Sequence, residues 1–201
     1  MVFLYHLICW ILTIYYRLFR RLRVTGREHI PSEGRVIFAP NHISYQDPFV
    51  LAPLILPRRL AFFAKKELFV FPLAQVMRGF GTFPVDRQGD ATGAIRSSLE
   101  ALEHGLDLGM FPEGTRNKSD DLTLPLKRGV ALIAAKAGVP VVPVSISGSK
   151  GFFRRIRVHF SAPLTIGPAP GERRISREEY DVFLAELRRR IEAPLKTRLT
   201  P

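Results

Sequence analysis

A histidine and an aspartate five residues apart are the residues of this sequence best suited to chemistry. His42 and Asp47 belong to the stretch N-H-I-S-Y-Q-D-P, residues 41–48. The stretch follows the apolar run 36–39, which we predict to be a buried strand. His42 would then lie just past the carboxyl end of a strand, where open α/β sheets place their active sites. An aspartate across a turn can bind one imidazole nitrogen and fix the tautomer, which leaves the other nitrogen free to act as a general base.

The same stretch also has a purely structural interpretation. Asn41 or Ser44 could cap a helix whose first turn contains Asp47, in which case His42 would have no chemical role. Because the pattern is short, this stretch alone gives the two interpretations about equal weight. The elements that position it, and the other polar residues of the chain, must decide between them.

Length and composition predict one basic domain. The chain has 201 residues, of which 46% are hydrophobic, and this suffices for a substantial core. The formal net charge of +12 favours anionic partners, namely nucleic acid, an anionic membrane surface or phosphorylated substrates. Cys9, the single cysteine, lies in an apolar segment, which excludes a disulfide framework and a cysteine metal site. A reducing compartment is the default expectation.

Residues 1–19 are rich in large aliphatic and aromatic side chains, and Arg17 is their one formal side-chain charge. Arg20, Arg21 and Arg23 follow this segment, whereas the positive charge of a secretory signal precedes its apolar region. As a helix, the apolar part before Arg17 would extend roughly 24 Å, short of the about 30 Å of a bilayer core. We therefore predict a membrane-associated helix with a basic cytoplasmic flank at 1–23, followed by one domain at 24–201. The alternative is an apolar helix packed on that domain.

Apolar runs that alternate with helical patterns predict an α/β fold. Ser176 and Glu179 form a capping box that begins a closing amphipathic helix. Pro143 predicts that its strand lies near a sheet edge or a strand end. The pattern indicates a single domain with a mixed, largely parallel sheet flanked by helices. We expect strands at 36–39, 60–64, 79–85, 108–111, 141–146 and 156–160, and helical segments at 48–56, 65–77, 94–104 and 130–137.

A second polar stretch, F-P-E-G-T-R-N at 111–117, comes where a predicted strand gives way to a loop. Gly114 would let the backbone approach a ligand, and the planar guanidinium of Arg116 suits a phosphate group. Glu113 could hold Arg116 or a substrate hydroxyl. The alternative is a turn followed by surface charge.

Further cations are predicted near the ends of strands and helices, where anions can bind. Arg87 follows the predicted strand 79–85, and its alternative role is an exposed ion pair of little energetic worth. Lys127 precedes the helix from residue 130, whose first backbone N–H groups could complete a phosphate site. Lys66 precedes another helical segment and is a weaker candidate.

Taken together, these stretches resemble the glycerolipid acyltransferase family, whose best-known activity is that of 1-acylglycerol-3-phosphate acyltransferase. The resemblance covers roughly residues 24–165 and rests on five stretches in order: N-H-I-S-Y-Q-D-P, K-K-E-L, G-T-F-P-V-D-R, F-P-E-G-T-R-N and V-P-V-V-P-V. It implies acyl transfer from acyl-CoA or acyl carrier protein to the hydroxyl of lysophosphatidic acid, which would form phosphatidic acid. Neither a cofactor nor a metal is expected.

Carried over residue by residue, the resemblance implies that His42 and Asp47 are the catalytic pair. The family's proline-bearing block, linked to the acyl site, falls on residues 139–144. The residues that match acceptor-binding positions, or that stand beside them as candidates, are Arg87, Glu113, Gly114, Thr115, Arg116, Lys66 and Lys127. We expect His42 to take the proton of the acceptor hydroxyl, which attacks the thioester directly.

Other functions are less favoured by the sequence. A protein that binds anionic lipid without chemistry would need neither His42 nor Asp47. The chain lacks a nucleic-acid recognition motif, and its apolar start favours membranes instead. Within the enzyme class, the acceptor could be another lysolipid or a lipid-like alcohol, because the motifs indicate the reaction more firmly than the substrate.

Overall fold

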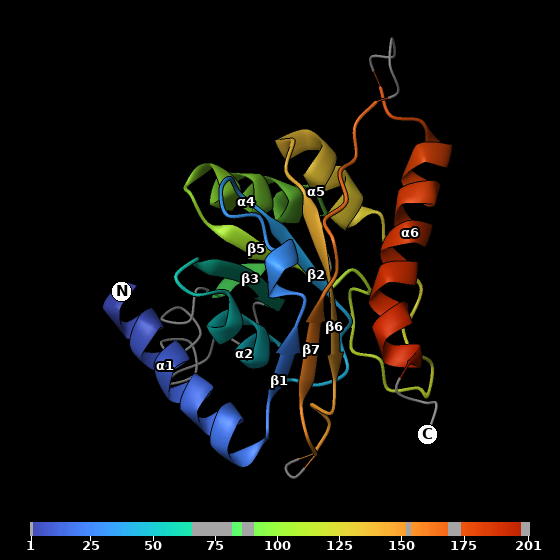
Figure 1. Ribbon diagram of the computed structural model, residues 1–201. Coiled ribbons are helices and arrows are strands. Elements are labelled where there is room, and N and C mark those ends of the chain that lie inside the picture. Colours follow the sequence, from blue (N-terminus) through green and yellow to red (C-terminus); the bar gives the residue numbers. More distant parts are fainter. Residues whose placement is uncertain (1, 66–81, 86–90, 152–153, 169–173, 198–201) are drawn as a thin grey trace.

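The computed structural model describes the chain except residues 1, 66–81, 86–90, 152–153, 169–173 and 198–201. Its centre is a sheet with the strand order β1-β7-β6-β2-β5-β3-β4 (Figure 1). Neighbouring strands are parallel except β6 and β7, which are antiparallel, so the predicted mixed, largely parallel sheet is confirmed. The strands are β1 (Arg23–Thr25), β2 (Ile37–Pro40), β3 (Leu60–Lys65), β4 (Thr82–Val85), β5 (Asp107–Gly109), β6 (Val141–Ser147) and β7 (Arg157–Phe160).

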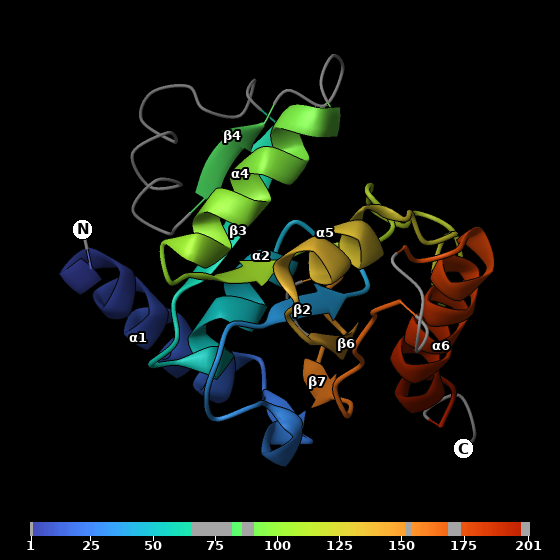
Figure 2. The same cartoon turned by 90° about the horizontal axis from the view of Figure 1, so that it is seen from above.

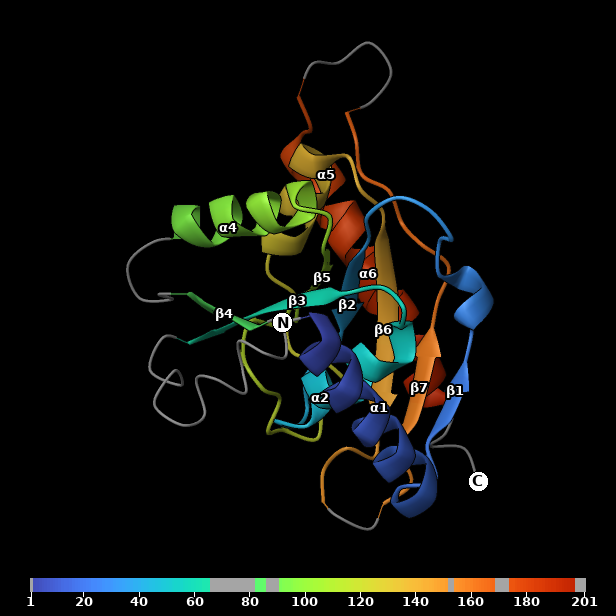
Figure 3. The same cartoon turned by 90° about the vertical axis from the view of Figure 1, so that its left-hand side faces the viewer.

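Helices cover both faces of this sheet, as the α/β pattern predicts. Figures 2 and 3 show α1 and α2 on one side of the sheet and α6 on the other. The α-helices are α1 (Val2–Phe19), α2 (Asp47–Leu51), α4 (Ala91–Glu103), α5 (Gly129–Ala137) and α6 (Arg177–Lys196), and the 3-10 helices are η1 (Arg27–His29) and η2 (Ala52–Ile55). The segment 66–77, where a helix is expected, lies outside the described residues.

The central strand β2 supplies side chains to two separate cores. Val36, just before the strand, and Phe38 pack with α1 and α2, whereas Ile37 and Ala39 pack with α4, α5 and α6. All four are fully buried. Because successive side chains of a strand point to opposite faces, an unbroken apolar run is what a strand covered on both faces requires.

Local sequence signals place several helix ends. The hydroxyl of Ser176 accepts a hydrogen bond from the Glu179 backbone N–H, and the Glu179 carboxylate accepts one from the Ser176 N–H, so the predicted capping box is confirmed. Gly138 follows α5 in the left-handed conformation (φ 65°), which glycine adopts at little cost. The end of α5 at Ala137 therefore agrees with the sequence pattern.

Pro143 does not mark a sheet edge, because β6 lies between β2 and β7. The carbonyl of Pro143 accepts a hydrogen bond from Ser161, on the β7 side, whereas that of Val144 accepts one from Asn41, on the β2 side. An N–H group at position 143 would therefore point toward β7. Because β7 pairs with β6 only over Val144–Ser147, Pro143 lies outside this pairing. Of the two predicted positions, the sheet edge is therefore wrong, and the proline is tolerated because the pairing with β7 ends at Val144.

The α1 helix has apolar side chains on two faces. Tyr5, Cys9 and Tyr16 are buried in the core beside α2, so α1 packs on the domain. Trp10 is 61% exposed and Phe19 is 70% exposed on the remaining surface. Within the described chain, no helix combines the length and apolar character that crossing a bilayer requires.

The buried carboxylate of Asp107, on β5, joins the segments before β2 and β3. Asp107 is fully buried, accepts a hydrogen bond from the Val36 N–H at 2.9 Å and pairs with Arg58 at 3.0 Å. Removing one partner of a buried pair leaves the other uncompensated. We expect Asp107→Asn to lower the free energy of unfolding by about 3 kcal/mol in a denaturant titration.

The exposed pair between Asp181 and Arg128, at 2.7 Å, provides the matched control. Asp181→Asn should change the free energy of unfolding by at most about 1 kcal/mol, because water screens an exposed pair. Equal losses in the two variants would contradict the structural role given to Asp107.

Candidate active site

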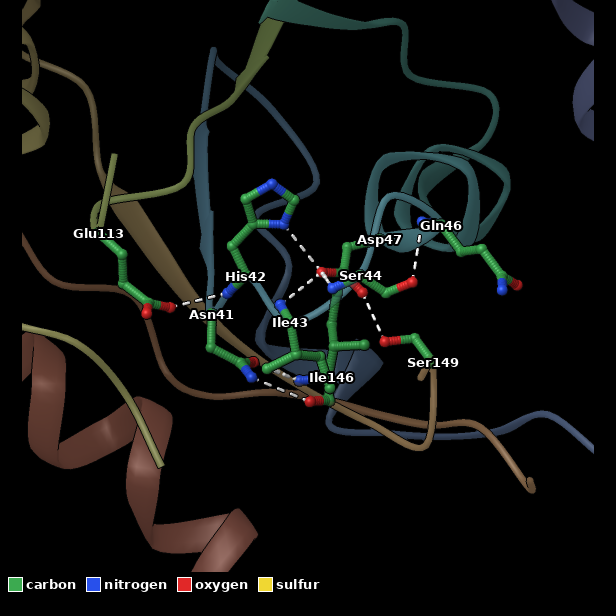
Figure 4. Close-up of polar contacts among 9 residues, drawn as sticks. All are labelled: Asn41, His42, Ile43, Ser44, Gln46, Asp47, Glu113, Ile146 and Ser149. Atoms are coloured by element: carbon green, nitrogen blue, oxygen red, sulfur yellow. Dashed lines mark hydrogen bonds and ion pairs between the residues drawn. The ribbon is translucent and has the colours of Figure 1, made fainter. Parts of the chain in front are cut away.

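The side chain of Asn41 determines where the chain leaves the sheet. Its amide donates to the Ile146 carbonyl at 3.0 Å, and its carbonyl accepts from the Ile146 N–H at 2.7 Å. This buried side chain thus continues the pairing of β2 with β6 in place of backbone groups. The main chain is free to turn away at this point, which puts His42 just beyond the carboxyl end of β2, as predicted (Figure 4).

Asp47 is fully buried beside His42, and its carboxylate is saturated with hydrogen-bond donors. One oxygen, Oδ2, accepts from His42 Nδ1 at 2.9 Å and from the backbone N–H groups of Ile43 and Ser44 at 2.8 Å each. The other, Oδ1, accepts from the Ser149 hydroxyl at 2.6 Å. Each of these partners can donate, so the four contacts suit the acceptor oxygens of a buried carboxylate.

The pairing with Asp47 determines which His42 nitrogen is available. A carboxylate at Nδ1 favours the neutral tautomer that carries its proton there, which leaves the Nε2 lone pair open. In Figure 4 the second ring nitrogen points away from Asp47, and it has no hydrogen-bond partner among the described residues. The side chain is 16% exposed, so a substrate hydroxyl can reach it. Its ring stacks on Phe111 with a centroid distance of 3.9 Å, which limits ring rotation.

Glu113 links the two polar stretches through backbone contacts. Its Oε1 accepts from the His42 N–H at 2.7 Å, and its Oε2 accepts from the Leu124 N–H at 2.9 Å. Burial raises the pKa of this carboxyl, while the two backbone N–H groups lower it. The contact with Arg116 considered above is not formed. The predicted substrate-binding role of Glu113 stays a prediction, and the observed contacts fix the backbone of the base.

Arg116 lies beside the same loop, with its guanidinium carbon 3.5 Å from the centroid of the Tyr45 ring. Its neighbour Asn117 donates a backbone hydrogen bond to the His42 carbonyl at 2.7 Å, so the two polar stretches are held side by side. Tyr45 is 67% exposed, and the stacked guanidinium keeps its N–H edge available to an anion.

Lys127 approaches the turn between these residues. Gly114 adopts φ 70°, and a Cβ atom built there would come within 2.9 Å of Lys127 Nζ. The left-handed backbone favours glycine here, whereas the flexible end of the Lys127 side chain could move away from a Cβ atom. The ammonium group thus lies close to the turn that carries Thr115 and Arg116, and its phosphate-binding role stays a prediction.

The other predicted site residues cannot be placed. Arg87 and Lys66 lie outside the described residues, so their roles stay predictions. In the described part of the chain, no group of three or more His, Cys, Asp or Glu side chains could hold a metal ion. The sequence analysis missed Tyr45 and Ser149. Tyr45 stands inside the motif, whereas no local signal indicates Ser149, which reaches Asp47 from 102 positions away in the chain.

Comparisons with known proteins give a consistent result. A family model described as acyltransferase matches residues 21–147. The 1-acyl-sn-glycerol-3-phosphate acyltransferase of Bacillus subtilis is 33% identical over 128 residues, which cover 63% of each protein. The enzyme of that name from Streptococcus pneumoniae is 36% identical over 141 residues, 67% of this chain and 51% of that protein. The chain thus spans about one half to two thirds of these two curated relatives.

A solved structure extends the likeness to nearly the whole chain. The crystal structure of the 1-acyl-sn-glycerophosphate (LPA) acyltransferase PlsC from Thermotoga maritima superposes with a TM-score of 0.70 at 27% sequence identity. The match covers 96% of this chain and 81% of that protein. The similarity therefore includes the α/β fold with its mostly parallel sheet.

The contacts of Glu113 lead to a stability prediction. Glutamine has the same shape but offers one acceptor oxygen instead of two, so either His42 or Leu124 would lose its N–H acceptor. We expect Glu113→Gln to lower the free energy of unfolding by about 1–3 kcal/mol in urea. Glu103, an exposed residue at the end of α4, serves as control, and its glutamine variant should stay within about 0.5 kcal/mol of the parent. An unchanged Glu113→Gln protein would contradict the bridging role.

Proposed function

The chain belongs to the acyltransferase family, and on this premise we propose that it moves a fatty acyl group from acyl-CoA or acyl carrier protein to 1-acylglycerol-3-phosphate. The product would be phosphatidic acid. The observation that carries the proposal is the 2.9 Å contact between Asp47 and His42 Nδ1, because it leaves Nε2 as a base at the surface of the site. The names of the relatives support the acceptor, and the thioester carrier is an inference from the family.

The reaction needs one base and no covalent intermediate. Nε2 of His42 takes the proton of the acceptor hydroxyl as its oxygen attacks the thioester carbonyl, and Asp47 stabilises the imidazolium that forms. The new ester bond forms, the carbon–sulfur bond breaks, and the imidazolium returns the proton to the leaving thiolate. Ser44 is a poor alternative nucleophile, because its hydroxyl accepts from the Gln46 N–H within the same turn as the base.

Cations beside the base would position the acceptor. Arg116 lies on the turn next to His42, Lys127 approaches this turn, and both would bind the acceptor phosphate. Arg87, which lies outside the described residues, would add to them. A phosphate held there would place the glycerol hydroxyl near Nε2, so their contribution is chiefly proximity. A fixed anion site would also favour phosphorylated acceptors over neutral ones.

We further propose that the outward face of α1 lies in the membrane interface. That face exposes several large apolar side chains, including Phe3 at 80% and Leu18 at 69%, although the opposite face packs on the domain. Arg17 and Arg21 are exposed at the end of the helix, where anionic headgroups would attract them. Such an arrangement would bring the catalytic domain to its lipid substrate from the cytoplasmic side.

The proposed reaction is tested with the purified full-length protein, a panel of lysolipid acceptors and both thioester carriers. Wild type should acylate lysophosphatidic acid. His42→Ala and Asp47→Asn should each lower turnover by on the order of 10² to 10⁴, because one removes the base and the other its fixed tautomer. Asp181→Asn, on exposed α6, should be unaffected. Wild-type turnover in either dyad variant would contradict the mechanism, and a preference for another lysolipid would contradict the acceptor.

Acceptor binding gives a separate prediction. Lysine cannot reproduce a bidentate contact with phosphate, so Arg116→Lys should lower kcat/KM for lysophosphatidic acid on the order of 10- to 100-fold. The kcat/KM for monoacylglycerol, which lacks the phosphate, should be nearly unchanged by this substitution. Arg128→Lys, at an exposed arginine that already pairs with Asp181, is the control. Equal losses on both acceptors would remove Arg116 from the phosphate site.

Membrane attachment is tested by flotation with vesicles that contain anionic phospholipid. Deleting α1 would expose the domain core, so substitutions on its outward face are the sharper test. Replacing Trp10 and Phe19 together by serine should lower the bound fraction severalfold, because their rings no longer enter the interface. Val182→Ser removes a side chain that is likewise 70% exposed, but on α6, and should change nothing. Equal binding by the two variants would argue against α1 as the anchor.

A further inference from the structure

The carboxylate of Asp47 is held from a second side by a distant loop. Ser149 follows β6 in the loop between β6 and β7, is fully buried, and donates its hydroxyl to Asp47 Oδ1 at 2.6 Å. The contacts of Oδ2 with His42, Ile43 and Ser44 all come from the chain just before Asp47. Among the described contacts of the Asp47 carboxylate, the one with Ser149 is therefore the one that comes from outside this local turn.

The direction of this hydrogen bond follows from the chemistry of its partners. An ionised carboxylate can only accept, and three donors already converge on Oδ2. The Ser149 hydroxyl must therefore donate, and it fixes the rotation of the carboxylate about its own axis. That rotation decides whether Oδ2 stays in line with His42 Nδ1.

Arg20, at the end of α1, holds the loop that carries Ser149. The guanidinium donates from Nη2 to the carbonyls of Gly148 and Gly151 at 3.1 and 2.7 Å, on either side of Ser149, and from Nε to the carbonyl of Arg154 at 3.2 Å. Its Nη1 donates to the Gln46 side chain at 2.9 Å, next to Asp47 in the chain. The side chain is only 1% exposed, although no carboxylate in the described chain pairs with it.

Burying an arginine without a carboxylate partner costs free energy, which hydrogen bonds to carbonyl groups partly offset. Here it joins the end of α1, the turn before α2 and the loop after β6. Gly148 adopts φ 79°, and a Cβ there would come within 2.0 Å of the Arg155 carbonyl oxygen, so the backbone next to Ser149 packs directly on the chain that enters β7. Ser149 is thus presented to Asp47 on a fixed support.

We infer that Ser149, presented by Arg20, is a positioning residue that keeps Asp47 aligned with His42 for proton transfer. The kinetic part of this inference rests on the proposed acyl transfer, whereas the alignment itself does not. Tyr16 on α1 and Glu113 after β5 are titratable groups of the described chain whose charges reach the pair. Burial raises the pKa of both, which keeps the Tyr16 phenol neutral at physiological pH.

The first test compares Ser149→Ala with Ser145→Ala in the acyl-transfer assay. Ser145 is the matched control, because its buried hydroxyl also donates at 2.6 Å, but to the Ile191 carbonyl on α6. Ser149→Ala should lower kcat on the order of tenfold, less than the 10² to 10⁴ expected for loss of the base, with the acceptor KM little changed. Ser145→Ala should keep the wild-type kcat. Equal effects would overturn the inference.

The pH profile separates positioning from a general loss of stability. Ser149→Ala removes a donor to the charged form of Asp47, so acid should inactivate this variant more readily than the wild type. The acidic limb of the kcat/KM profile should move to higher pH in Ser149→Ala and stay in place in Ser145→Ala. An unmoved limb in Ser149→Ala would contradict the positioning role.

Amide hydrogen exchange tests the alignment without any activity. The Ile43 and Ser44 N–H groups donate to Asp47, so their exchange in the full-length protein should be faster in Ser149→Ala than in Ser145→Ala. This result would stand even if lysophosphatidic acid proved not to be the acceptor. Unchanged exchange at both amides would overturn the inference while leaving the proposed function intact.

Arg20 is tested by a double-mutant cycle. If Arg20 acts through Ser149, Arg20→Lys should lower kcat alone but add little to Ser149→Ala, because the contact it supports is already gone. Independent, multiplicative losses would show that Arg20 does not act through Ser149. Thermal unfolding of the Arg20→Lys protein confirms that the variant is folded at the assay temperature.

Discussion

The structure of the site depends on one buried charge. Asp47 is fully enclosed, and an ionised carboxylate there is tolerable only because four donors meet its two oxygens. Those donors come from the turn after β2 and from the loop after β6, so satisfying the charge requires both segments in fixed positions. The same requirement fixes the tautomer of His42. The contacts that stabilise the buried carboxylate are thus the same contacts that orient His42 for catalysis.

The parallel sheet brings the necessary segments to one edge. β2, β5 and β6 run in the same direction, and their carboxyl ends release the turn with His42, the loop with Glu113 and the loop with Ser149. Beyond the strand ends, side chains form the hydrogen bonds that backbone groups form within the sheet. Asn41 continues the pairing of β2 with β6, and Glu113 accepts a hydrogen bond from the backbone N–H of His42. Arg20 adds the end of α1 to this arrangement, which connects the proposed membrane face to the catalytic pair.

The local parts of this arrangement could be predicted from the sequence, and the long-range parts could not. The apolar run before Asn41, the five-residue spacing of His42 and Asp47, and the capping box at Ser176 all act within a few residues, so their patterns predicted the strand, the pair and the start of α6. Ser149 and Arg20 contact residues more than a hundred positions away in the chain, and such contacts produce no local or periodic sequence pattern. The sheet-edge alternative for Pro143 was wrong for a related reason, since the cost of a proline depends on where the neighbouring strand ends.

The central claim is that Asp47 holds the His42 proton on Nδ1 and leaves Nε2 open to the acceptor hydroxyl. The most direct measurement is ¹⁵N NMR of the imidazole in the full-length, detergent-solubilised protein, with the His42 resonances assigned by their absence from His42→Ala. The account predicts that neutral His42 carries its proton on Nδ1 and that Nε2 has the shift of an unprotonated nitrogen. A neutral ring protonated on Nε2 would contradict it, because that nitrogen would then have no lone pair with which to take the proton.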